Sequence, residues 1–221
     1  MNEKAKRKNV RVVLIEDHRM FREWLGLMLA KGGAISVCGE TDNIAEGIDL
    51  IQKTKPDIAI VDLTLRGSSG LELIKNLKAL RLDVPVLVLS MHDEELYAER
   101  VLRAGGRGYI SKHEASSALI EAVNKILGGE VYLPGNITSQ ILKRLSGGGG
   151  NKPAGLALLA DRELEVFQWI GKGYNARRIA EQLNLGESTV ETYRARIKEK
   201  LGIRTAAELY QHAALWVSTL Q

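Results

Sequence analysis

Short apolar runs in the first half of the chain predict five β-strands. Each run is too short for a helix and is bounded by polar or turn-forming residues. The predicted strands are Val10 to Ile15, Ala34 to Gly39, Ile58 to Val61, Val84 to Leu89 and Gly108 to Ile110. The run from Ile58 to Val61 has no polar alternation, which is typical of a central parallel strand buried on both faces.

Amphipathic stretches follow each predicted strand and predict five helices. They are Met20 to Ala30, Ile44 to Lys53, Leu71 to Leu80, Leu96 to Ala104 and Ala115 to Leu127. Asn43 followed by Glu46 has the spacing of a capping box at the start of the second helix. Strands that alternate with helices predict an α/β domain with a doubly wound, five-stranded parallel sheet covered by helices on both faces.

The strand pattern stops after Gly129. A tetraglycine at 147–150 indicates a flexible linker. Beyond it the apolar spacing predicts only helices, at Arg162 to Gly171, Ala176 to Leu183, Thr189 to Leu201 and Thr205 to Val217. We therefore expect a basic tail at 1–9, an α/β domain at 10–128, a linker at 129–153 and a second, smaller all-α domain at 154–221.

Composition is that of an ordinary globular protein, with 45% hydrophobic and 26% charged residues. The net charge of +4 is uneven, because residues 12–150 carry 16 Lys/Arg against 18 acids and residues 151–221 carry 10 against 8. Cys38 is the single cysteine, which excludes an internal disulfide framework and favours a reducing compartment. No apolar run is long enough to span a bilayer, so we expect a cytoplasmic protein without a membrane partner.

Acidic residues follow two of the predicted strands. Glu16 and Asp17 come directly after the first strand, and Asp62 comes after the third. The carboxyl ends of parallel strands share one edge of the sheet, so these side chains should converge. Three neighbouring carboxylates repel one another unless a cation neutralises them, and hard oxygen ligands suit Mg²⁺. The sequence therefore predicts a magnesium site.

Two further polar residues follow strands at the same edge. Ser90 closes the fourth strand and Lys112 comes just after the fifth. A cation and an ammonium group could neutralise a transferring phosphoryl group, and the hydroxyl could donate a hydrogen bond to it. Asp62 would then be a nucleophile that forms an acyl phosphate.

In their order and spacing, these five residues make 10–128 resemble the receiver domain of two-component response regulators, which has the flavodoxin-like fold. The resemblance implies that a histidine kinase phosphorylates Asp62 and that the Thr64 backbone carbonyl is a further magnesium ligand. It also implies that Ser90 and Tyr109 form a switch. His113 stands where proline is frequent, which leaves open whether the peptide bond after Lys112 is cis.

The second domain carries a helix-turn-helix pattern, because a tight turn at 184–186 joins the helix that ends at Leu183 to a longer helix. Arg162-Glu163-x-Glu165-Val166, Ile179-Ala180-x-x-Leu183 and Lys200-Leu201-Gly202 resemble the LuxR-type domain of the NarL/FixJ family. The resemblance implies that the longer helix enters a major groove of double-stranded DNA. The candidate DNA-contacting residues are Ser188, Thr189, Thr192, Arg194, Ala195, Arg196, Lys198 and Lys200.

Roles within this helix follow from its geometry. With Val190 facing the core, Ser188, Thr192, Ala195, Arg196 and Glu199 point outward. Thr192 and Arg196 are expected to read base edges, and Lys198 and Lys200 to contact phosphates. Ser188 and Glu191 have the spacing of a capping box, which we prefer to a contact between Glu191 and cytosine.

The final helix is open to two interpretations. Its apolar residues Leu209, Ala213 and Trp216 could pair two DNA-binding domains or could belong to the internal core. In the first case they would support a homodimer that forms on phosphorylation.

Together these features predict a phosphorylation-controlled transcription factor that is not an enzyme and at most dephosphorylates itself. One alternative is the same architecture controlled by protein contacts without phosphorylation. Another is an aspartyl-phosphate enzyme, which usually carries a second aspartate two residues after the nucleophile. Thr64 occupies that position here and disfavours this alternative.

Overall fold

The computed structural model describes residues 9–31, 33–65, 68–91, 94–135, 137–139 and 155–218, apart from the side chain of residue 95. The chain divides into two compact units, Met1–Ile141 and Leu142–Gln221. The tetraglycine and residues 1–8 of the predicted basic tail lie outside the described residues. The residue-level boundaries of the four predicted segments stay predictions.

The first unit is built on a five-stranded parallel sheet in the order β2-β1-β3-β6-β7. Its strands are β1 (Val10–Ile15), β2 (Ile35–Thr41), β3 (Ile58–Asp62), β6 (Val86–Ser90) and β7 (Gly108–Ser111). The chain starts in β1, moves outward to β2 and then returns across β1 to β3, so the order reverses between β1 and β3. The doubly wound α/β fold predicted from the sequence is confirmed.

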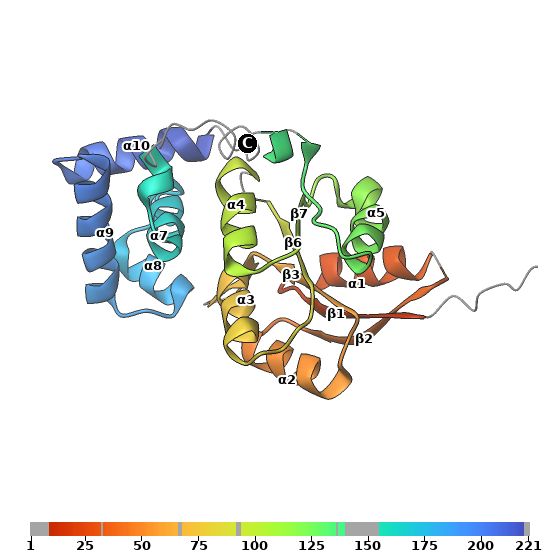
Figure 1. Ribbon diagram of the computed structural model, residues 1–221. Helices are drawn as coiled ribbons and strands as arrows, with labels where there is room; N and C mark the ends of the chain where they lie inside the picture. The colour runs from red at the N-terminus through yellow and green to blue at the C-terminus, as the bar shows by residue number, and fades with distance from the viewer. Residues whose placement is uncertain are drawn as a thin grey trace, which may run out of the picture. The chain divides into compact units, whose positions relative to one another are not determined.

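Helices cover both faces of this sheet (Figure 1). They are α1 (Arg19–Ala30), α2 (Ile44–Thr54), α3 (Gly70–Ala79), α4 (Glu94–Ala104) and α5 (Ala115–Leu127). Alternate residues of each strand serve opposite faces. Val12 and Leu14 of β1 belong to the core cluster with Leu25 of α1 and Val123 of α5. Ile15 lies on the other face, where its side chain fills the space above Gly47 of α2.

A short antiparallel hairpin was not predicted. It pairs β4 (Thr64–Leu65) with β5 (Ser68–Ser69) directly after β3. Strands of two residues are too short to show periodicity, so the apolar pattern carries no signal for them.

The predicted capping box at Asn43 is only half present. Asn43 Oδ1 accepts hydrogen bonds from the Ala45 and Glu46 backbone N–H groups at 2.8 and 3.2 Å. The Glu46 carboxylate instead accepts a hydrogen bond from the Thr41 hydroxyl at 2.5 Å. The Asn43 N–H, which Glu46 would satisfy in a capping box, donates instead to the Thr41 hydroxyl at 3.2 Å.

The second unit is helical throughout its described residues. Its elements are the 3₁₀ turn η1 (Gly155–Leu158) and the helices α7 (Asp161–Gly171), α8 (Ala176–Leu183), α9 (Glu187–Leu201) and α10 (Ala206–Ser218). The four predicted helices are confirmed, and η1 was not predicted. No helix among the described residues combines the length and apolar composition needed to cross a membrane.

Helices α7 and α10 form the core of this unit. Leu209 and Ala213 are fully buried, and the Trp216 ring lies 5.6 Å from the Phe167 ring between centroids. A Cβ atom at Gly171 would overlap the Ala213 carbonyl oxygen, so the two helices pack in backbone contact there. The apolar stripe of the last helix is therefore internal core, which was one of its two interpretations.

Candidate functional site

The carboxyl ends of four neighbouring strands position the predicted site. Hydrogen-bonded registers align Ile15 with Val61, Asp62 with Leu89 and Ser90 with Ser111. Glu16 follows β1 directly, Asp62 and Ser90 are the last residues of their strands, and Lys112 follows β7. The Lys112 backbone N–H donates to the Ser90 carbonyl at 2.8 Å, which fixes where this lysine leaves the sheet.

Lys112 joins two buried carboxylates. Its Nζ lies 2.8 Å from Asp62 Oδ2 and 2.8 Å from Glu16 Oε2. It also donates to Glu16 Oε1 at 3.0 Å. Only 4% of Asp62 and 1% of Glu16 are exposed, so water can barely solvate these side chains. The Lys112 ammonium stabilises them instead.

Burial shapes the protonation of this group. It raises the pKa of Asp62 to about 7, and the negative charge of Glu16 adds to the rise, while Lys112 opposes it. Burial alone would lower the pKa of Lys112, but the charge of Asp62 and the hydrogen bonds to both carboxylates raise it above its ordinary value. Lys112 therefore stays protonated, and the two acidic side chains beside it can still attract a second cation.

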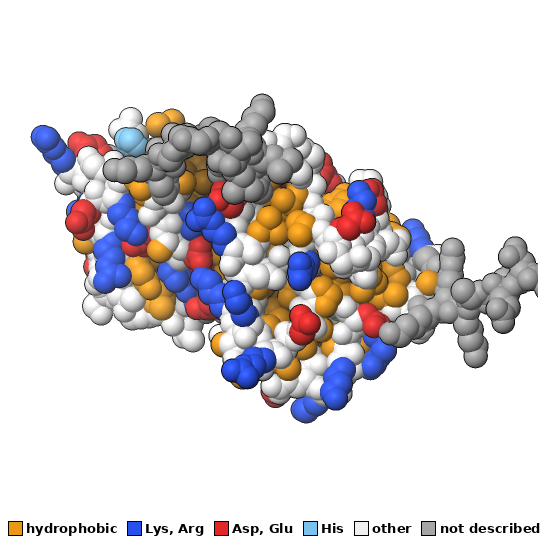
Figure 2. All heavy atoms as spheres, viewed as in Figure 1, with side chains coloured by type: hydrophobic (Ala, Val, Ile, Leu, Met, Phe, Trp, Pro, Cys, Tyr) orange, Lys and Arg blue, Asp and Glu red, His pale blue; other side chains and the backbone are white. Residues whose placement is uncertain are grey.

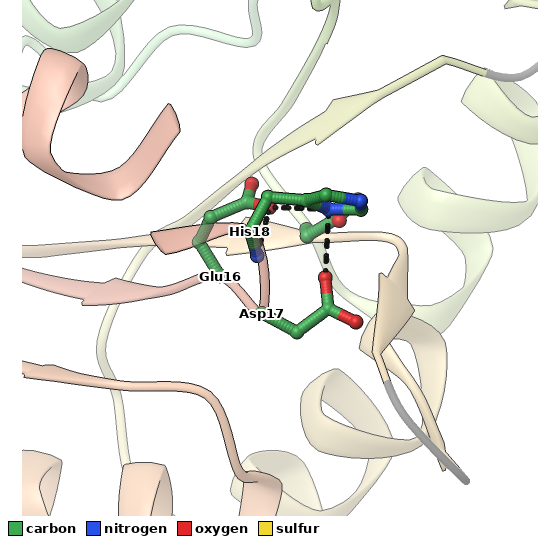
Figure 3. A group of neighbouring side chains, drawn as sticks. Glu16, Asp17 and His18 are labelled. Carbon is green, nitrogen blue, oxygen red and sulfur yellow. Dashed lines mark hydrogen bonds and ion pairs between the residues drawn. The ribbon is translucent and has the colours of Figure 1, made fainter. Parts of the chain in front are cut away.

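Four side chains of the kinds that ligate metals lie together at this bridge. Glu16, Asp17, His18 and Asp62 each offer a ligand atom, and these atoms lie within 4.8 Å of one another. Figure 3 shows the His18 imidazole pointing toward the Glu16 and Asp17 carboxylates, with Nδ1 at 3.2 Å from Glu16 Oε1 and 2.9 Å from Asp17 Oδ1. Most of these donors are oxygen atoms, and the buried Glu16 Oε2 accepts no well-aligned hydrogen bond from the described residues, which suits a hard divalent cation.

The loop after β3 holds Asp62 through its backbone. The Thr64 N–H donates to Asp62 Oδ1 at 3.2 Å, and the Gly70 N–H donates to the Leu63 carbonyl at 2.8 Å. A Cβ atom on Gly70 would lie 2.5 Å from the Asp62 carbonyl oxygen. The start of α3 can approach the end of β3 this closely only because position 70 has no side chain.

The two proposed switch residues lie inside the domain. Ser90 and Tyr109 are both fully buried. The Tyr109 backbone is also hydrogen-bonded to the segment that follows α5, since its N–H donates to the Tyr132 carbonyl at 3.0 Å. The Tyr132 N–H donates in turn to the Arg107 carbonyl at 3.0 Å, so Tyr132 adds one parallel bridge to the edge of β7. No cis peptide bond occurs in the described residues, so the bond after Lys112 is trans.

Helix α9 presents the predicted DNA-facing residues. Val190 and Ile197 are buried, and the five residues predicted to point outward are all exposed, namely Ser188, Thr192, Ala195, Arg196 and Glu199. Thr189 and Lys198 are half-buried. The Thr192 hydroxyl donates to the Ser188 carbonyl at 2.9 Å, which orients its methyl group and leaves the oxygen able to accept.

Two of the predicted DNA contacts already have acidic partners. Lys200 Nζ lies 2.6 Å from Oε2 of Glu163, a residue that is only 3% exposed and also accepts from the Ala160 N–H. Arg194 lies 2.6 Å from Glu191 and 5.3 Å from the centre of the Tyr210 ring. Lys200 therefore ties α9 to the start of α7, and Arg194 ties α9 to α10.

The predicted capping box of Ser188 and Glu191 is wrong. Helix α9 begins at Glu187 with Gly186 as its N-cap, so Ser188 already lies within the first turn. Glu191 pairs with Arg194 instead of reaching back to the helix start. The cause is that the helix begins one residue before the serine that the motif requires as its cap.

Figure 2 shows Lys and Arg side chains interspersed with acidic ones over the part of the surface that carries α9. The helix itself holds four basic and three acidic residues. Arg196 and Lys198 are the basic residues of α9 for which the described part of the chain provides no ion pair. The cationic surface available to DNA is thus narrower than the sequence count indicates.

Three residues at the receiver-like site were not predicted. His18 completes a run of three consecutive ligand-type residues, which is a signal that the sequence does carry. Gly70 has no such signal, because its close approach to Asp62 depends on the loop geometry. Phe21 places its ring 4.7 Å from Lys112 Nζ, and an aromatic residue at an apolar helix position is indistinguishable in sequence from core.

Comparison with protein-family models gives two matches. Residues 12–124 match the response regulator receiver domain, and residues 157–213 match the bacterial regulatory proteins of the luxR family. Among curated proteins, a putative transcriptional regulator of Pseudomonas aeruginosa is 36% identical over 92% of this chain and 96% of its own length. The transcriptional regulatory protein DegU of Brevibacillus brevis is 32% identical over 98% of this chain and 99% of its own length.

Solved structures give the same assignment. The response regulator ChrA of a heme-sensing two-component system is 29% identical, with a TM-score of 0.52 over 96% of this chain and 99% of that one. RcsB of Salmonella typhimurium is 22% identical, with a TM-score of 0.71 over 97% of this chain and 99% of that one, and shares the fold. The chain belongs to the NarL/FixJ-type response regulators, which join a receiver domain to a LuxR-type helix-turn-helix domain. The predicted family is confirmed, and the chain is a DNA-binding transcription regulator.

We expect Gly70→Ala to destabilise the receiver. The added methyl group would meet the Asp62 carbonyl oxygen, which is backbone and has no flexible side chain to move aside. Overpacking of this kind costs roughly 1–3 kcal/mol. Urea unfolding followed through Trp24 fluorescence measures the change. Gly135→Ala is the matched control, because nothing lies within 4 Å of its Cβ position, and an equal effect of both variants would contradict the close-approach argument.

We expect Lys200→Ala to lower the stability of the C-terminal unit by roughly 1–2 kcal/mol, since it leaves the buried Glu163 charge with one hydrogen bond fewer. The partial exposure of Lys200 keeps the cost below that of a fully buried pair. Thermal unfolding monitored through Trp169 and Trp216 tests this. Lys198→Ala, two positions earlier, should leave the transition unchanged, and identical transitions for Lys200→Ala and wild type would remove the proposed role of this ion pair.

Proposed function

We propose that Asp62 accepts a phosphoryl group from a histidine kinase and that its phosphorylation controls promoter binding by the C-terminal domain. The observation that carries the proposal is the position of Lys112, whose ammonium lies 2.8 Å from both Asp62 and Glu16 at the carboxyl edge of the sheet. A carboxylate that is almost fully buried and held by a lysine has little purpose in packing alone.

Asp62 is the nucleophile in this proposal. One of its carboxylate oxygens attacks the phosphorus atom of the phosphohistidine, a P–O bond forms, and the P–N bond breaks with its electron pair returning to the donor imidazole. Lys112 faces the same carboxylate and neutralises the negative charge of the phosphoryl oxygens. The Thr64 N–H, which now donates to Asp62 Oδ1, provides a further hydrogen bond at the same position.

Mg²⁺ fits the donor set of this site. Glu16, Asp17 and Asp62 would hold it, with the Thr64 carbonyl as a further ligand. When bound, the cation would neutralise the carboxylates and the phosphoryl oxygens, which lowers the repulsion between nucleophile and phosphate. Because burial and Glu16 raise the pKa of Asp62 to about 7, added positive charge also keeps Asp62 in the ionised form that attacks.

The signal would pass through Ser90 and Tyr109. In the proposal the Ser90 hydroxyl donates to the phosphoryl group and the buried Tyr109 ring stabilises the new arrangement. Tyr109 shares a backbone hydrogen bond with Tyr132, so a shift of β7 would also move the first residues of the predicted linker. Phosphorylation would thereby promote a homodimer that places two copies of α9 on neighbouring DNA half-sites.

DNA recognition is assigned to the exposed side of α9. Thr192 and Arg196 are the candidates for base edges, with Ser188, Thr189 and Ala195 lining the same helix face. Lys198 is the candidate phosphate contact. Arg194 and Lys200 would make weaker contacts with DNA, since Arg194 is paired with Glu191 and Lys200 with Glu163.

Two alternatives predict different behaviour. A receiver controlled only by protein contacts would bind DNA equally well with or without phosphorylation. An aspartyl-phosphate enzyme would turn over small phosphate esters, but Thr64 stands where such enzymes carry their acid or base. We therefore propose a phosphoacceptor that does not turn over small phosphate esters and that at most dephosphorylates itself.

We expect the full chain to gain one phosphate when incubated with Mg²⁺ and acetyl phosphate, because a carboxylate neutralised by a cation can attack a small phosphoryl donor. Intact mass and sensitivity to hydroxylamine identify the acyl phosphate. Asp62→Asn and removal of Mg²⁺ by EDTA should each abolish labelling. Asp49→Asn, a change at an exposed position of α2, should label like wild type. Persistent labelling of Asp62→Asn would place the acceptor elsewhere.

We expect Arg196→Ala to lose discrimination among DNA sites, by roughly 1–3 kcal/mol if the guanidinium reads a guanine bidentately. Affinities for an operator selected in vitro by the full chain and for a scrambled duplex, each at two salt concentrations, measure this. Lys198→Ala should instead weaken both duplexes alike and flatten the salt dependence. An equal loss on both duplexes in Arg196→Ala would remove Arg196 from base readout.

A further inference from the structure

Phe21 of α1 contacts the lysine of the phosphoryl-acceptor site. The Lys112 ammonium lies 4.7 Å from the centre of the Phe21 ring, in addition to its contacts with Asp62 and Glu16. This is within the range in which the negative face of an aromatic ring attracts a cation. Because the lysine side chain is only 8% exposed, the attraction is weakly screened by water.

Packing against neighbouring side chains holds the Phe21 ring in place. Phe21 stacks on Trp24, with ring centroids 5.2 Å apart and an angle of 27° between the planes. Both side chains pack against the core cluster that α1 and α5 form with the sheet. The ring therefore presents a fixed surface to the ammonium.

The contacts of Lys112 differ in what competes for them. Glu16 and Asp62 are also the candidate ligands of a divalent cation, which repels the ammonium and draws on the same carboxylate oxygens. The Phe21 ring offers no ligand atom to a hard cation. A metal bound to the carboxylates therefore does not compete directly for the contact between the ring and Lys112.

We infer that Phe21 is a positioning residue for Lys112. Its ring retains the ammonium beside Asp62 while the divalent cation occupies the carboxylates, so that Lys112 meets the incoming phosphoryl group in place. The inference rests on the proposed function of Asp62 as phosphoryl acceptor.

A double-mutant cycle on the full chain tests it, with beryllofluoride in the presence of Mg²⁺ as the probe for the phosphoryl group. Titration calorimetry should show Phe21→Leu binding the probe about 2–30-fold more weakly, which is the range expected for one cation–π contact. Phe21→Tyr, which keeps an aromatic face, should recover affinity to within about twofold of wild type. In a Lys112→Met background, Phe21→Leu should cause no further loss, because no cation remains to be positioned.

Pentafluorophenylalanine at position 21 separates electrostatics from packing. It keeps the ring in place and reverses the charge distribution of its face, so it should weaken probe binding as Phe21→Leu does, even if the leucine variant folds poorly. A loss in Phe21→Leu that persists in the Lys112→Met background, or full affinity with the fluorinated ring, overturns the inference in favour of simple core packing. Failure of the wild-type chain to bind beryllofluoride overturns the proposed function and the inference together, whereas normal binding by every Phe21 variant overturns the inference alone.

Discussion

The burial of two carboxylates beside one ammonium is the constraint on which the receiver depends. Glu16 and Asp62 are 1% and 4% exposed, and Lys112 at 2.8 Å from each supplies the positive charge that offsets the cost of burying two acids. Burial raises the pKa of Asp62 to about 7, and the negative charge of Glu16 adds to the rise, because one ammonium does not fully offset two acids. The fold thus keeps an excess of negative charge at one point, and a site with this imbalance is suited to gaining a cation and transferring a charged group.

The parallel sheet makes that arrangement possible because its strand ends lie in one row. Asp62 pairs with Leu89, and Ser90 pairs with Ser111. This register brings Asp62 and Lys112, which are 50 positions apart, within hydrogen-bonding distance. A slip of one residue in any of these strands would turn its last side chain to the other face. The register of β1 and β3 therefore determines the chemistry as well as the core, since it fixes which way Glu16 and Asp62 point.

Features with a periodic apolar pattern could be predicted from the sequence, whereas features that depend on three-dimensional geometry could not. The strands, helices and the residues at their ends follow from apolar runs, so Asp62, Lys112 and Ser90 could be placed at one edge of the sheet. Gly70 could not, because its role depends on a carbonyl oxygen that the β4–β5 hairpin brings close. The Ser188 capping box matched a local pattern, but the N-cap is Gly186, two residues earlier, and motifs at helix ends are sensitive to shifts of this size.

The C-terminal domain shows why counting basic residues overstates a DNA-binding surface. Lys200 stabilises the start of α7 through Glu163, and Arg194 joins α9 to α10 through Glu191 and Tyr210. These cations hold the helix in the orientation that the other side chains need, so their charges act first within the protein. Arg196 is exposed and has no acidic partner among the described residues, so in the proposed complex it would be the side chain of α9 available to a base edge, on a helix that these neighbours hold in place. In both domains, then, a lysine paired with a buried carboxylate stabilises the region that carries the proposed acting residue, which is Asp62 at the end of β3 and Arg196 on α9.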